Sequence, residues 1–311
     1  MSTPVGKTAL ITGANAGIGK EVARQLALRP EFARIYLACR NRERAKAAQA
    51  ELEAETGRRI FDIVLMDVAD QGTVRAALAA IDGSVDALVM NAGVIGPNSM
   101  GLTVDGVTTQ FATNVLGHAV LLERLLAENR LGEVAVFVGS EAVVGVPKLG
   151  MKRPSFVSHA PDELASVMCG CFFAGKKADF NLAFAQAKYL GALWIGYLAR
   201  QYPDLRFLTV SPGNTTGTGA PSDLPLPMRI AAKYVLPALG FSHKLDVGAK
   251  RIVDGLTDPT LSSGAFYASP ANKLTGPLTN QAEIMPDLAN PLFQENTNEA
   301  IHSAMRLHLR G

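Results

Sequence analysis

A glycine-rich turn near the N-terminus is the first part of the sequence that could do chemistry. The apolar run "KTALIT" ends at Thr12 and passes directly into "TGANAGIG", where Gly13, Gly17 and Gly19 open an amphipathic stretch. Glycines at such a turn let the backbone approach a pyrophosphate closely, and the helix N-terminus offers free N–H groups. Strand, turn and helix come in the order of a dinucleotide site. The alternative is a tight strand-to-helix turn in an unrelated fold.

Basic residues after the second apolar run bear on the choice of cofactor. The chain reads "ACRNRERAK", whereas a site selective for NAD commonly has an acid here to bind the ribose 2′-hydroxyl. Arg40 and Arg42 could instead grip a 2′-phosphate, which predicts NADP(H). The alternative is a solvated basic start to a helix at 42–56. Asp67, after the third run, could accept a hydrogen bond from the adenine amino group or cap the next helix.

Short apolar runs and amphipathic helices alternate along the chain and must position these residues. The runs are typical of strands buried on both faces and occupy 7–12, 33–38, 61–66, 86–91, 133–140 and 206–211. Helices are expected at 19–28, 41–56, 71–81 and 106–128. Strict alternation predicts an α/β fold with a Rossmann-type, doubly wound parallel sheet, in a single domain over residues 1–311.

Two long irregular segments interrupt this alternation. The first is an insertion at 141–180, and the second is a Pro- and Gly-rich segment at 214–246. Both leave the carboxyl ends of strands, where open α/β sheets bind ligands. The second segment is rich in Leu, Pro and Met, so we expect a lid over an apolar, fairly bulky small molecule. An ordinary packing helix or a subunit contact is the alternative.

The composition excludes several classes of protein. A net charge of +2 with 48% hydrophobic residues predicts a soluble globular protein that does not bind nucleic acid. The N-terminus lacks the features of a signal peptide, and the longest apolar helical stretch is too short to span a membrane. Cys39, Cys169 and Cys171 form no CxxC pair; the last two are too close for an easy bridge, and no metal site is expected. A cytoplasmic protein is predicted, and a homo-oligomer stays open.

Five ordered motifs resemble those of the short-chain dehydrogenase/reductase family over nearly the whole chain. They are "TGANAGIG", "NAG" at 91–93, "TNVLGH" around Asn114, "VFVGS" ending at Ser140, and "SPGNTTGT" at 211–218. Within the family, the spacing is most similar to light-dependent protochlorophyllide reductases, and "TGANAGIGKE" with "CR" resembles retinol dehydrogenase-like reductases. The resemblance implies hydride transfer between NADP(H) and a carbonyl, an alcohol or a conjugated C=C bond. It also implies a cofactor site built from Thr12, Gly13, Asn15, Gly17, Ile18, Gly19, Arg40, Arg42, Asp67, Val68, Asn91, Ala92, Gly93, Lys188, Pro212, Gly213 and Thr218.

The same resemblance implies a catalytic set in which one member is changed. In the family a serine, here Ser140, holds the reacting oxygen, and a lysine, here Lys188, binds the nicotinamide ribose. Asn114 corresponds to the asparagine that helps to hold a relay water. The family's proton-donating tyrosine is replaced by Phe184, four residues before the lysine in "NLAFAQAKYLG". Because phenylalanine has no exchangeable proton, carbonyl reduction should be slowed by a factor of about 10²–10⁴.

Phe184 leaves three interpretations open. The chain is an engineered Tyr→Phe variant with impaired proton transfer, or a natural reductase that takes its proton from elsewhere, or a sensor or scaffold that keeps the NADP site. Glu141, His159, Cys169 and Asp179 are candidate donors, each with an ordinary loop or surface role as the alternative. Tyr189 is expected to point away from the site and join the core.

Overall fold

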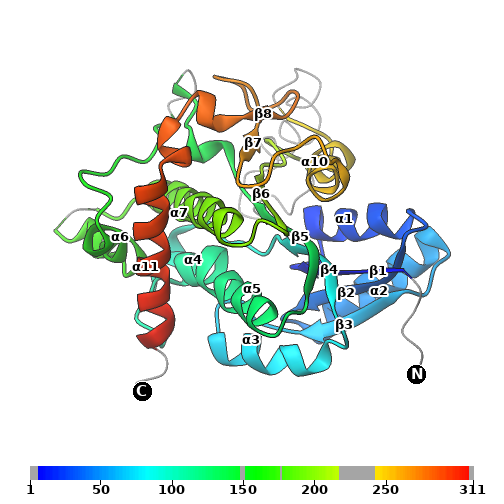
Figure 1. The fold of residues 1–311 in the computed structure, drawn as a ribbon. Coiled ribbons are helices and arrows are strands. Elements are labelled where there is room, and N and C mark those ends of the chain that lie inside the picture. The colour runs from blue at the N-terminus through cyan, green and yellow to red at the C-terminus, as the bar shows by residue number, and fades with distance from the viewer. Residues whose placement is uncertain (1–5, 148–150, 176, 217–241, 308–311) are drawn as a thin grey trace, which may run out of the picture.

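The computed structural model describes residues 6–147, 151–175, 177–216 and 242–307, which form a sheet covered by helices on both faces (Figure 1). The sheet has eight strands in the order β3-β2-β1-β4-β5-β6-β7-β8. All neighbouring pairs are parallel except β7 and β8. The strands are β1 (Lys7–Thr12), β2 (Phe32–Cys39), β3 (Phe61–Leu65), β4 (Val85–Met90), β5 (Leu131–Val138), β6 (Arg206–Val210), β7 (Phe266–Ala268) and β8 (Thr279–Asn280).

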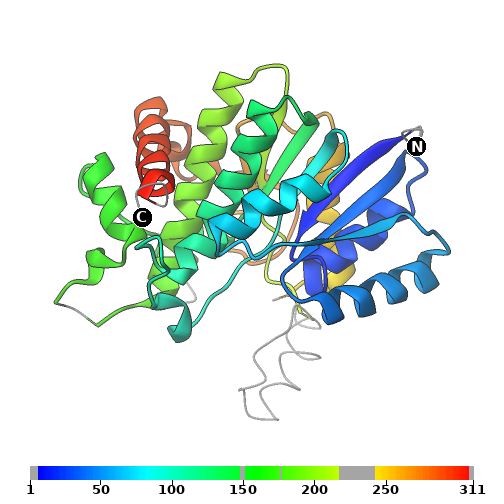
Figure 2. The same cartoon turned by 90° about the horizontal axis from the view of Figure 1, so that it is seen from below.

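The helices form one layer on each face of the sheet, with an extra layer on one side. Helices α1, α2 and α10 cover one face, α3, α5 and α7 cover the other, and α11 packs outside against α6 and α7 (Figures 1 and 2). Their bounds are α1 (Gly17–Ala27), α2 (Arg42–Thr56), α3 (Gln71–Ala77), α4 (Thr109–Phe111), α5 (Gly117–Ala127), α6 (Pro161–Met168), α7 (Phe180–Gln201), α10 (Leu245–Thr257) and α11 (Pro291–Leu307).

Side-chain alternation along the central strands explains why both faces are covered. In β1, Leu10 belongs to the core beneath α3, α5 and α7, whereas Ala9 and Ile11 belong to the core beneath α1, α2 and α10. Successive residues of a strand point to opposite faces of the sheet. A strand with apolar residues on both faces therefore needs helices to cover both faces. The predicted α/β class and doubly wound sheet are therefore confirmed, and six of the strands were expected.

The structure departs from the expected elements in three places. The helix expected at 106–128 is broken into α4, a π-helical turn (Ala112–Leu116) and α5. The insertion at 141–180 contains α6, and β7 and β8 extend the sheet beyond the six expected strands. Of the 214–246 lid, residues 217–241 lie outside the described residues, and Thr218 is among them.

The expectation that Cys169 and Cys171 do not bridge is wrong. The structure joins them in a disulfide, with their Cα atoms 5.4 Å apart. Gly170 between them has φ +73°, a left-handed conformation that glycine adopts without strain. This turn after the end of α6 brings the two Cβ atoms to the same side of the chain.

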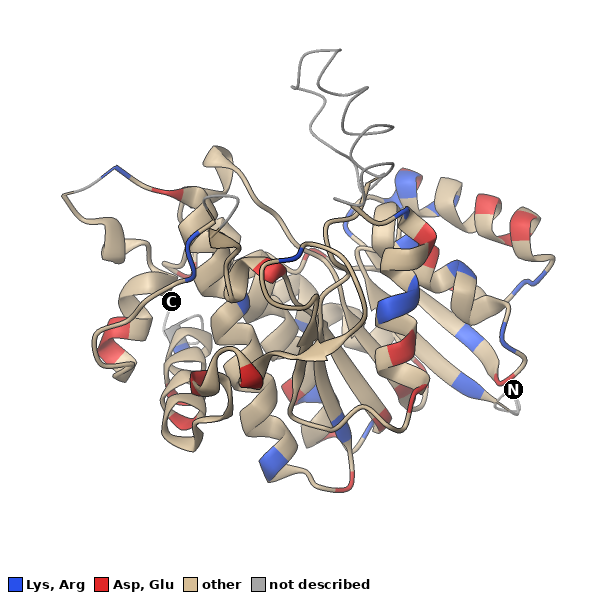
Figure 3. Ribbon diagram, turned by 90° about the horizontal axis from the view of Figure 1, so that it is seen from above, with Lys and Arg blue, Asp and Glu red and all other residues tan. Residues whose placement is uncertain are grey.

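The charged residues do not gather in one part of the described fold. Lys and Arg positions are interspersed with Asp and Glu positions over the ribbon (Figure 3). No helix in the described part of the chain is both long enough and apolar enough to cross a membrane.

Candidate active site

The glycine turn between β1 and α1 leaves backbone N–H groups available to an anion. Gly13 and Gly17 have φ angles of +67° and +55°, which favour glycine. Ala16 precedes α1 and gives no side-chain cap, so the first N–H groups of the helix are free to bind a ligand. A Cβ on Gly19 would lie 2.6 Å from the Gly13 carbonyl oxygen, so glycine permits the close approach of helix to turn.

Thr12 and Asn91 fasten the turn to the end of β4. The Thr12 hydroxyl oxygen accepts from the backbone N–H groups of Asn91 and Ala92, both at 2.9 Å. The Asn91 side-chain amide donates to the Thr12 carbonyl oxygen at 2.8 Å. His118 Nε2 lies 2.9 Å from the same hydroxyl, and burial lowers the pKa of His118 to about 3, so the ring is neutral at ordinary pH. The turn is thus held by uncharged hydrogen bonds.

A cavity of about 370 Å³ opens beside this turn, and we call it the glycine-turn cavity. Arg40 lines it, is exposed, and has no hydrogen bond or ion pair with the rest of the described chain. Thr12, Gly19 and Arg42 do not line it: the first two are buried, and Arg42 starts α2. The other expected residues in its wall are Gly13, Asn15, Gly17, Ile18, Asp67, Val68, Asn91, Ala92 and Gly93.

Asp67 does not cap the following helix. Its carboxylate accepts from the Ala69 N–H at 3.0 Å, whereas α3 is capped by Asp70, which accepts from Gly72 and Thr73. The capping alternative for Asp67 is therefore wrong. Its carboxylate remains in the wall of the glycine-turn cavity.

A second cavity of about 500 Å³ lies at the carboxyl ends of β4, β5 and β6, and we call it the Ser140–Lys188 cavity. It is adjacent to the glycine-turn cavity, with which it shares four lining residues: Ile18, Asn91, Gly93 and Val94. The structure brings the following expected residues together in its wall: Asn114, Ser140, Phe184, Lys188, Pro212 and Gly213.

Phe184 and Lys188 lie one turn apart on the same face of α7, as residues four apart in a helix do. Asp179 caps this helix by accepting from the N–H groups of Asn181 and Leu182. Lys188 is 3% exposed, and its Nζ donates to the Val138 carbonyl oxygen at 2.8 Å. Burial lowers the pKa of Lys188 to about 7.

The π turn places Asn114 against this lysine. The Asn114 amide donates to the carbonyl oxygens of Val94 and Gln110, both at 2.8 Å. Its Oδ1 is buried and has no hydrogen-bond partner among the described residues. A Cβ on Gly93 would lie 2.7 Å from this oxygen and 3.7 Å from Lys188 Nζ, so both groups converge on the same backbone position. An unpaired buried acceptor of this kind fits a donor from a ligand or water.

Ser140 caps a 3₁₀ turn (Glu141–Val143) at the end of β5. Its Oγ accepts from the Ala142 N–H at 3.2 Å, which leaves the hydroxyl hydrogen free to donate elsewhere. Ser211 and Met151 are among the lining residues that were not predicted as site residues. For Ser211 a signal exists, because it is a polar residue at the carboxyl end of a strand.

A third cavity of about 600 Å³ lies beyond Phe184 and Ser140, and we call it the outer cavity. It shares Ile95, Ser140, Met151 and Phe184 with the Ser140–Lys188 cavity. Its further lining is Ala142, Lys152, Asp179, Asn181, Leu182 and Ala185.

The candidate replacement donors lie in different surroundings. His159 is hydrogen-bonded to the Tyr189 hydroxyl at 2.9 Å, and Tyr189 is fully buried, as expected. Cys169 is in the disulfide, and Asp179 caps α7. Of the four candidates only Glu141 lines the Ser140–Lys188 cavity. Among the described residues, no group of three or more His, Cys, Asp or Glu could hold a metal ion.

The parallel sheet and the glycine turn after β1 define a Rossmann-type fold. The family model for short chain dehydrogenases matches residues 7–150. Retinol dehydrogenase 12 of Bos taurus is 41% identical over 134 residues, which is 42% of this chain and 40% of the relative. Retinol dehydrogenase 12 of Homo sapiens is 37% identical over 142 residues, or 44% of each chain. The match thus spans about two fifths of the length of these curated relatives.

Solved structures share the fold over most of the chain. Salutaridine reductase from Papaver somniferum has a TM-score of 0.61 at 18% identity, covering 84% of this chain and 99% of that one. A short chain dehydrogenase from Burkholderia cenocepacia in complex with NADP has a TM-score of 0.56 at 25% identity, covering 85% and 96%. By the family model and the curated relatives, residues 7–150 are thus similar to short chain dehydrogenases, and the fold is shared with solved reductases over most of the chain.

Proposed function

We propose that this chain is an NADP(H)-dependent oxidoreductase that acts on an apolar, fairly bulky small molecule. The observation that carries the proposal is that the glycine-turn cavity and the Ser140–Lys188 cavity are adjacent and share four wall residues, as the two halves of one extended ligand require. The free N–H groups of α1 suit a pyrophosphate, and the unpaired Oδ1 of Asn114 suits a donor in the second cavity. When bound, NADP(H) supplies or accepts the hydride.

The preference for the 2′-phosphate rests on Arg40. Its guanidinium lines the glycine-turn cavity and is free of partners in the described chain, so it is available to a phosphate. Arg42 is a weaker candidate because it lies outside the cavity wall. A carbonyl reductase from chicken fatty liver with NADPH bound has the same fold, with a TM-score of 0.57, 18% identity, and coverage of 84% of this chain and 95% of that one.

Ser140 and Lys188 have the main polar roles at the reacting end. The free hydroxyl hydrogen of Ser140 can donate to a substrate oxygen, and Lys188 Nζ can bind the ribose hydroxyls. Phe184 lines the same cavity and has no proton to give. We therefore propose slow proton transfer, either in a Tyr→Phe variant or in a reaction on a conjugated C=C bond, where the product carbon is protonated by solvent.

The outer cavity supports an apolar substrate. Three of the four residues that it shares with the Ser140–Lys188 cavity are apolar, namely Ile95, Met151 and Phe184, and several curated relatives are named for retinol. The alternative function is an NADP-binding sensor or scaffold without turnover, and the observation that favours it is Phe184 itself. A cytoplasmic location and a homo-oligomer stay predictions of the sequence.

One experiment tests the proposal and separates it from the alternative. The protein is titrated with NADPH and NADH, and wild type and Phe184→Tyr are then assayed on a panel of apolar ketones, enones and alcohols. We expect tighter binding of NADPH, and a rise in turnover of about 10²-fold or more in Phe184→Tyr because a general acid is restored. Phe172→Tyr, which adds the same hydroxyl away from the cavities, is the control and should change neither NADPH binding nor turnover.

The outcomes differ for each hypothesis. A wild-type protein that binds neither nucleotide refutes the dinucleotide proposal. A Phe184→Tyr protein that binds NADPH but turns over no member of the panel supports the sensor or scaffold alternative.

A further inference from the structure

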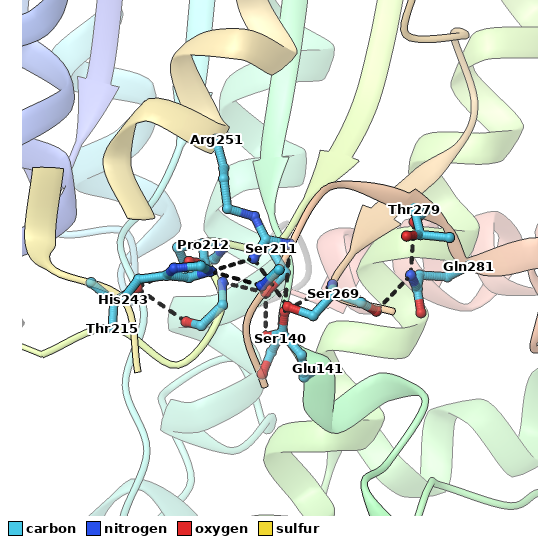
Figure 4. A network of polar contacts seen from close by, with 12 residues as sticks. Ser140, Glu141, Ser211, Pro212, Thr215, His243, Arg251, Ser269, Thr279 and Gln281 are labelled. Atoms are coloured by element: carbon cyan, nitrogen blue, oxygen red, sulfur yellow. Dashed lines mark hydrogen bonds and ion pairs between the residues drawn. The ribbon is translucent and has the colours of Figure 1, made fainter. Parts of the chain in front are cut away.

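A buried carboxylate lies where β5, β6 and β7 end, next to Ser140 (Figure 4). It belongs to Glu141, which is 5% exposed and lines the Ser140–Lys188 cavity. Burial of a charge is costly unless hydrogen bonds and an opposite charge compensate for it. The partners of Glu141 therefore indicate what the carboxylate holds in place.

Within the described residues, the Glu141 carboxylate contacts hydrogen-bond donors and a cation. Oε2 accepts from the Ser211 hydroxyl at 2.5 Å, and Oε1 accepts from the Ser269 hydroxyl at 2.9 Å and its N–H at 3.2 Å. Arg251 Nη2 lies 3.7 Å from Oε1, and this arginine is also 5% exposed. Both carboxylate oxygens are used as hydrogen-bond acceptors, so their geometry does not suit Glu141 as a replacement for the tyrosine that donates a proton.

Ser211 transmits the position of the carboxylate to the loop after β6. While the Ser211 hydroxyl donates to Glu141, its oxygen accepts from the Gly213 N–H at 3.1 Å. Pro212, Gly213 and Thr215 of this loop line the Ser140–Lys188 cavity. The carboxylate thus fixes the start of the 211–215 loop through one oriented hydroxyl.

Arg251 supports the same loop from α10. A Cβ on Gly213, where φ is +76°, would lie 2.7 Å from Arg251 Nη1, so the loop rests directly on the guanidinium. Nη1 also donates to the Ser269 hydroxyl and to His243 Nε2, both at 3.0 Å. The His243 N–H in turn donates to the Asn214 carbonyl oxygen at 2.6 Å. Glu141 therefore holds the 211–215 loop through Ser211, and Arg251 holds it through Gly213 and His243.

We propose that Glu141 is a positioning residue that, through Ser211 and Arg251, sets the 211–215 loop to receive the nicotinamide half of the dinucleotide. The inference rests on the proposed function, because it assigns the Ser140–Lys188 cavity to that half. The glycine-turn cavity has no wall residue in this network, so the adenosine half binds independently of Glu141.

The test compares two ligands in calorimetric titrations of the full chain. NADPH spans both cavities, whereas adenosine 2′,5′-bisphosphate reaches only the glycine-turn cavity. Glu141→Gln leaves Arg251 without its counter-charge and places an amide where only acceptors fit. We expect it to weaken NADPH binding at least about tenfold and to leave binding of adenosine 2′,5′-bisphosphate within about twofold of wild type.

Two further variants keep the result interpretable. Ser211→Ala removes the link to Gly213 without breaking the ion pair between Glu141 and Arg251, and it should weaken NADPH binding in the same selective way. It serves as the test if Glu141→Gln does not fold. Glu163→Gln is the matched control, since this carboxylate accepts from the N–H groups of Val157, Ser158 and His159 and lines neither cavity. It should bind both ligands as wild type does.

Selective loss of NADPH affinity supports the inference. Wild-type NADPH affinity in Glu141→Gln or Ser211→Ala overturns it, and so does an equal loss of both ligands in folded protein. A wild-type chain that binds neither ligand instead overturns the proposed function.

Discussion

At the scale of single residues, Lys188 is the buried cation next to Phe184. Its Nζ lies 5.7 Å from the centre of the Phe184 ring and 4.8 Å from that of Phe137. Burial lowers the pKa of Lys188 to about 7, because the buried ammonium loses its hydration and no carboxylate among the described residues compensates for that loss. The free protein therefore favours the neutral amine above pH 7, whereas a bound anionic ligand favours the ammonium.

This shift predicts proton uptake when NADPH binds. At pH 8 the amine of the free protein is mostly neutral, and the negative charge of the ligand should raise its pKa, so binding should take up close to one proton. The uptake should fade as the pH falls below 7, where the free protein is already protonated. Calorimetry in two buffers of different ionisation enthalpy measures it. Lys188→Met should take up almost none, and equal uptake by both proteins would contradict this role.

At the scale of elements, the helix between β4 and β5 contacts the loop after β3 through Gly117. A Cβ at this position would lie 1.8 Å from the Val68 carbonyl oxygen. Glycine therefore allows α5 to press directly on the backbone that walls the glycine-turn cavity. No flexible side chain lies between them to absorb an added atom.

Gly117→Ala should accordingly lower the free energy of unfolding by about 3 kcal/mol, because helix and loop must separate. The matched control is Gly101→Ala, where an added Cβ meets no atom within 4 Å. The control should stay within about 0.5 kcal/mol of wild type. Urea unfolding followed by circular dichroism measures both, and equal values for the two variants would refute the packing argument.

The same scale shows what the sequence could predict. Strands β1 to β6 and helices α1 and α2 were predicted because apolar runs and amphipathic periods are local properties. The π turn was missed, because it depends on the Asn114 amide bonding to the Gln110 carbonyl rather than on composition. Strands β7 and β8 were missed because they are short and rely on pairing with β6. Motif residues can be predicted, but not the partners of Glu141, which come from three distant segments: Ser211, Arg251 and Ser269.

At the scale of the whole molecule, α11 links the insertion to the sheet. It packs against α6 and α7, and its Ile301 is fully buried in the core that includes Trp194 of α7. Trp194 is the only tryptophan of the sequence and is fully buried, so its fluorescence reports on this core. The proposed single domain requires the insertion and the sheet to unfold together.

Ile301→Ala should lower the free energy of unfolding by about 2–5 kcal/mol, the usual cost of removing a buried aliphatic side chain. Trp194 fluorescence and far-UV circular dichroism should shift together to lower denaturant concentration, because one cooperative unit is affected. Leu292→Ala, on the same helix but 58% exposed, is the control and should change little. Separate transitions for the two probes would show that the α11 region is an independent unit.

The π turn at Ala112–Leu116 also has a consequence for the length of the chain. A π turn holds more residues than an α turn, so this helix contains one residue of slack. Deleting Thr113 could convert the segment to continuous α-helix while α5 keeps its place on the sheet. The shortened chain would then still fold, but the Asn114 side chain would no longer point into the cavity. Such a deletion would therefore separate the ability to fold from the ability to bind a ligand at Asn114.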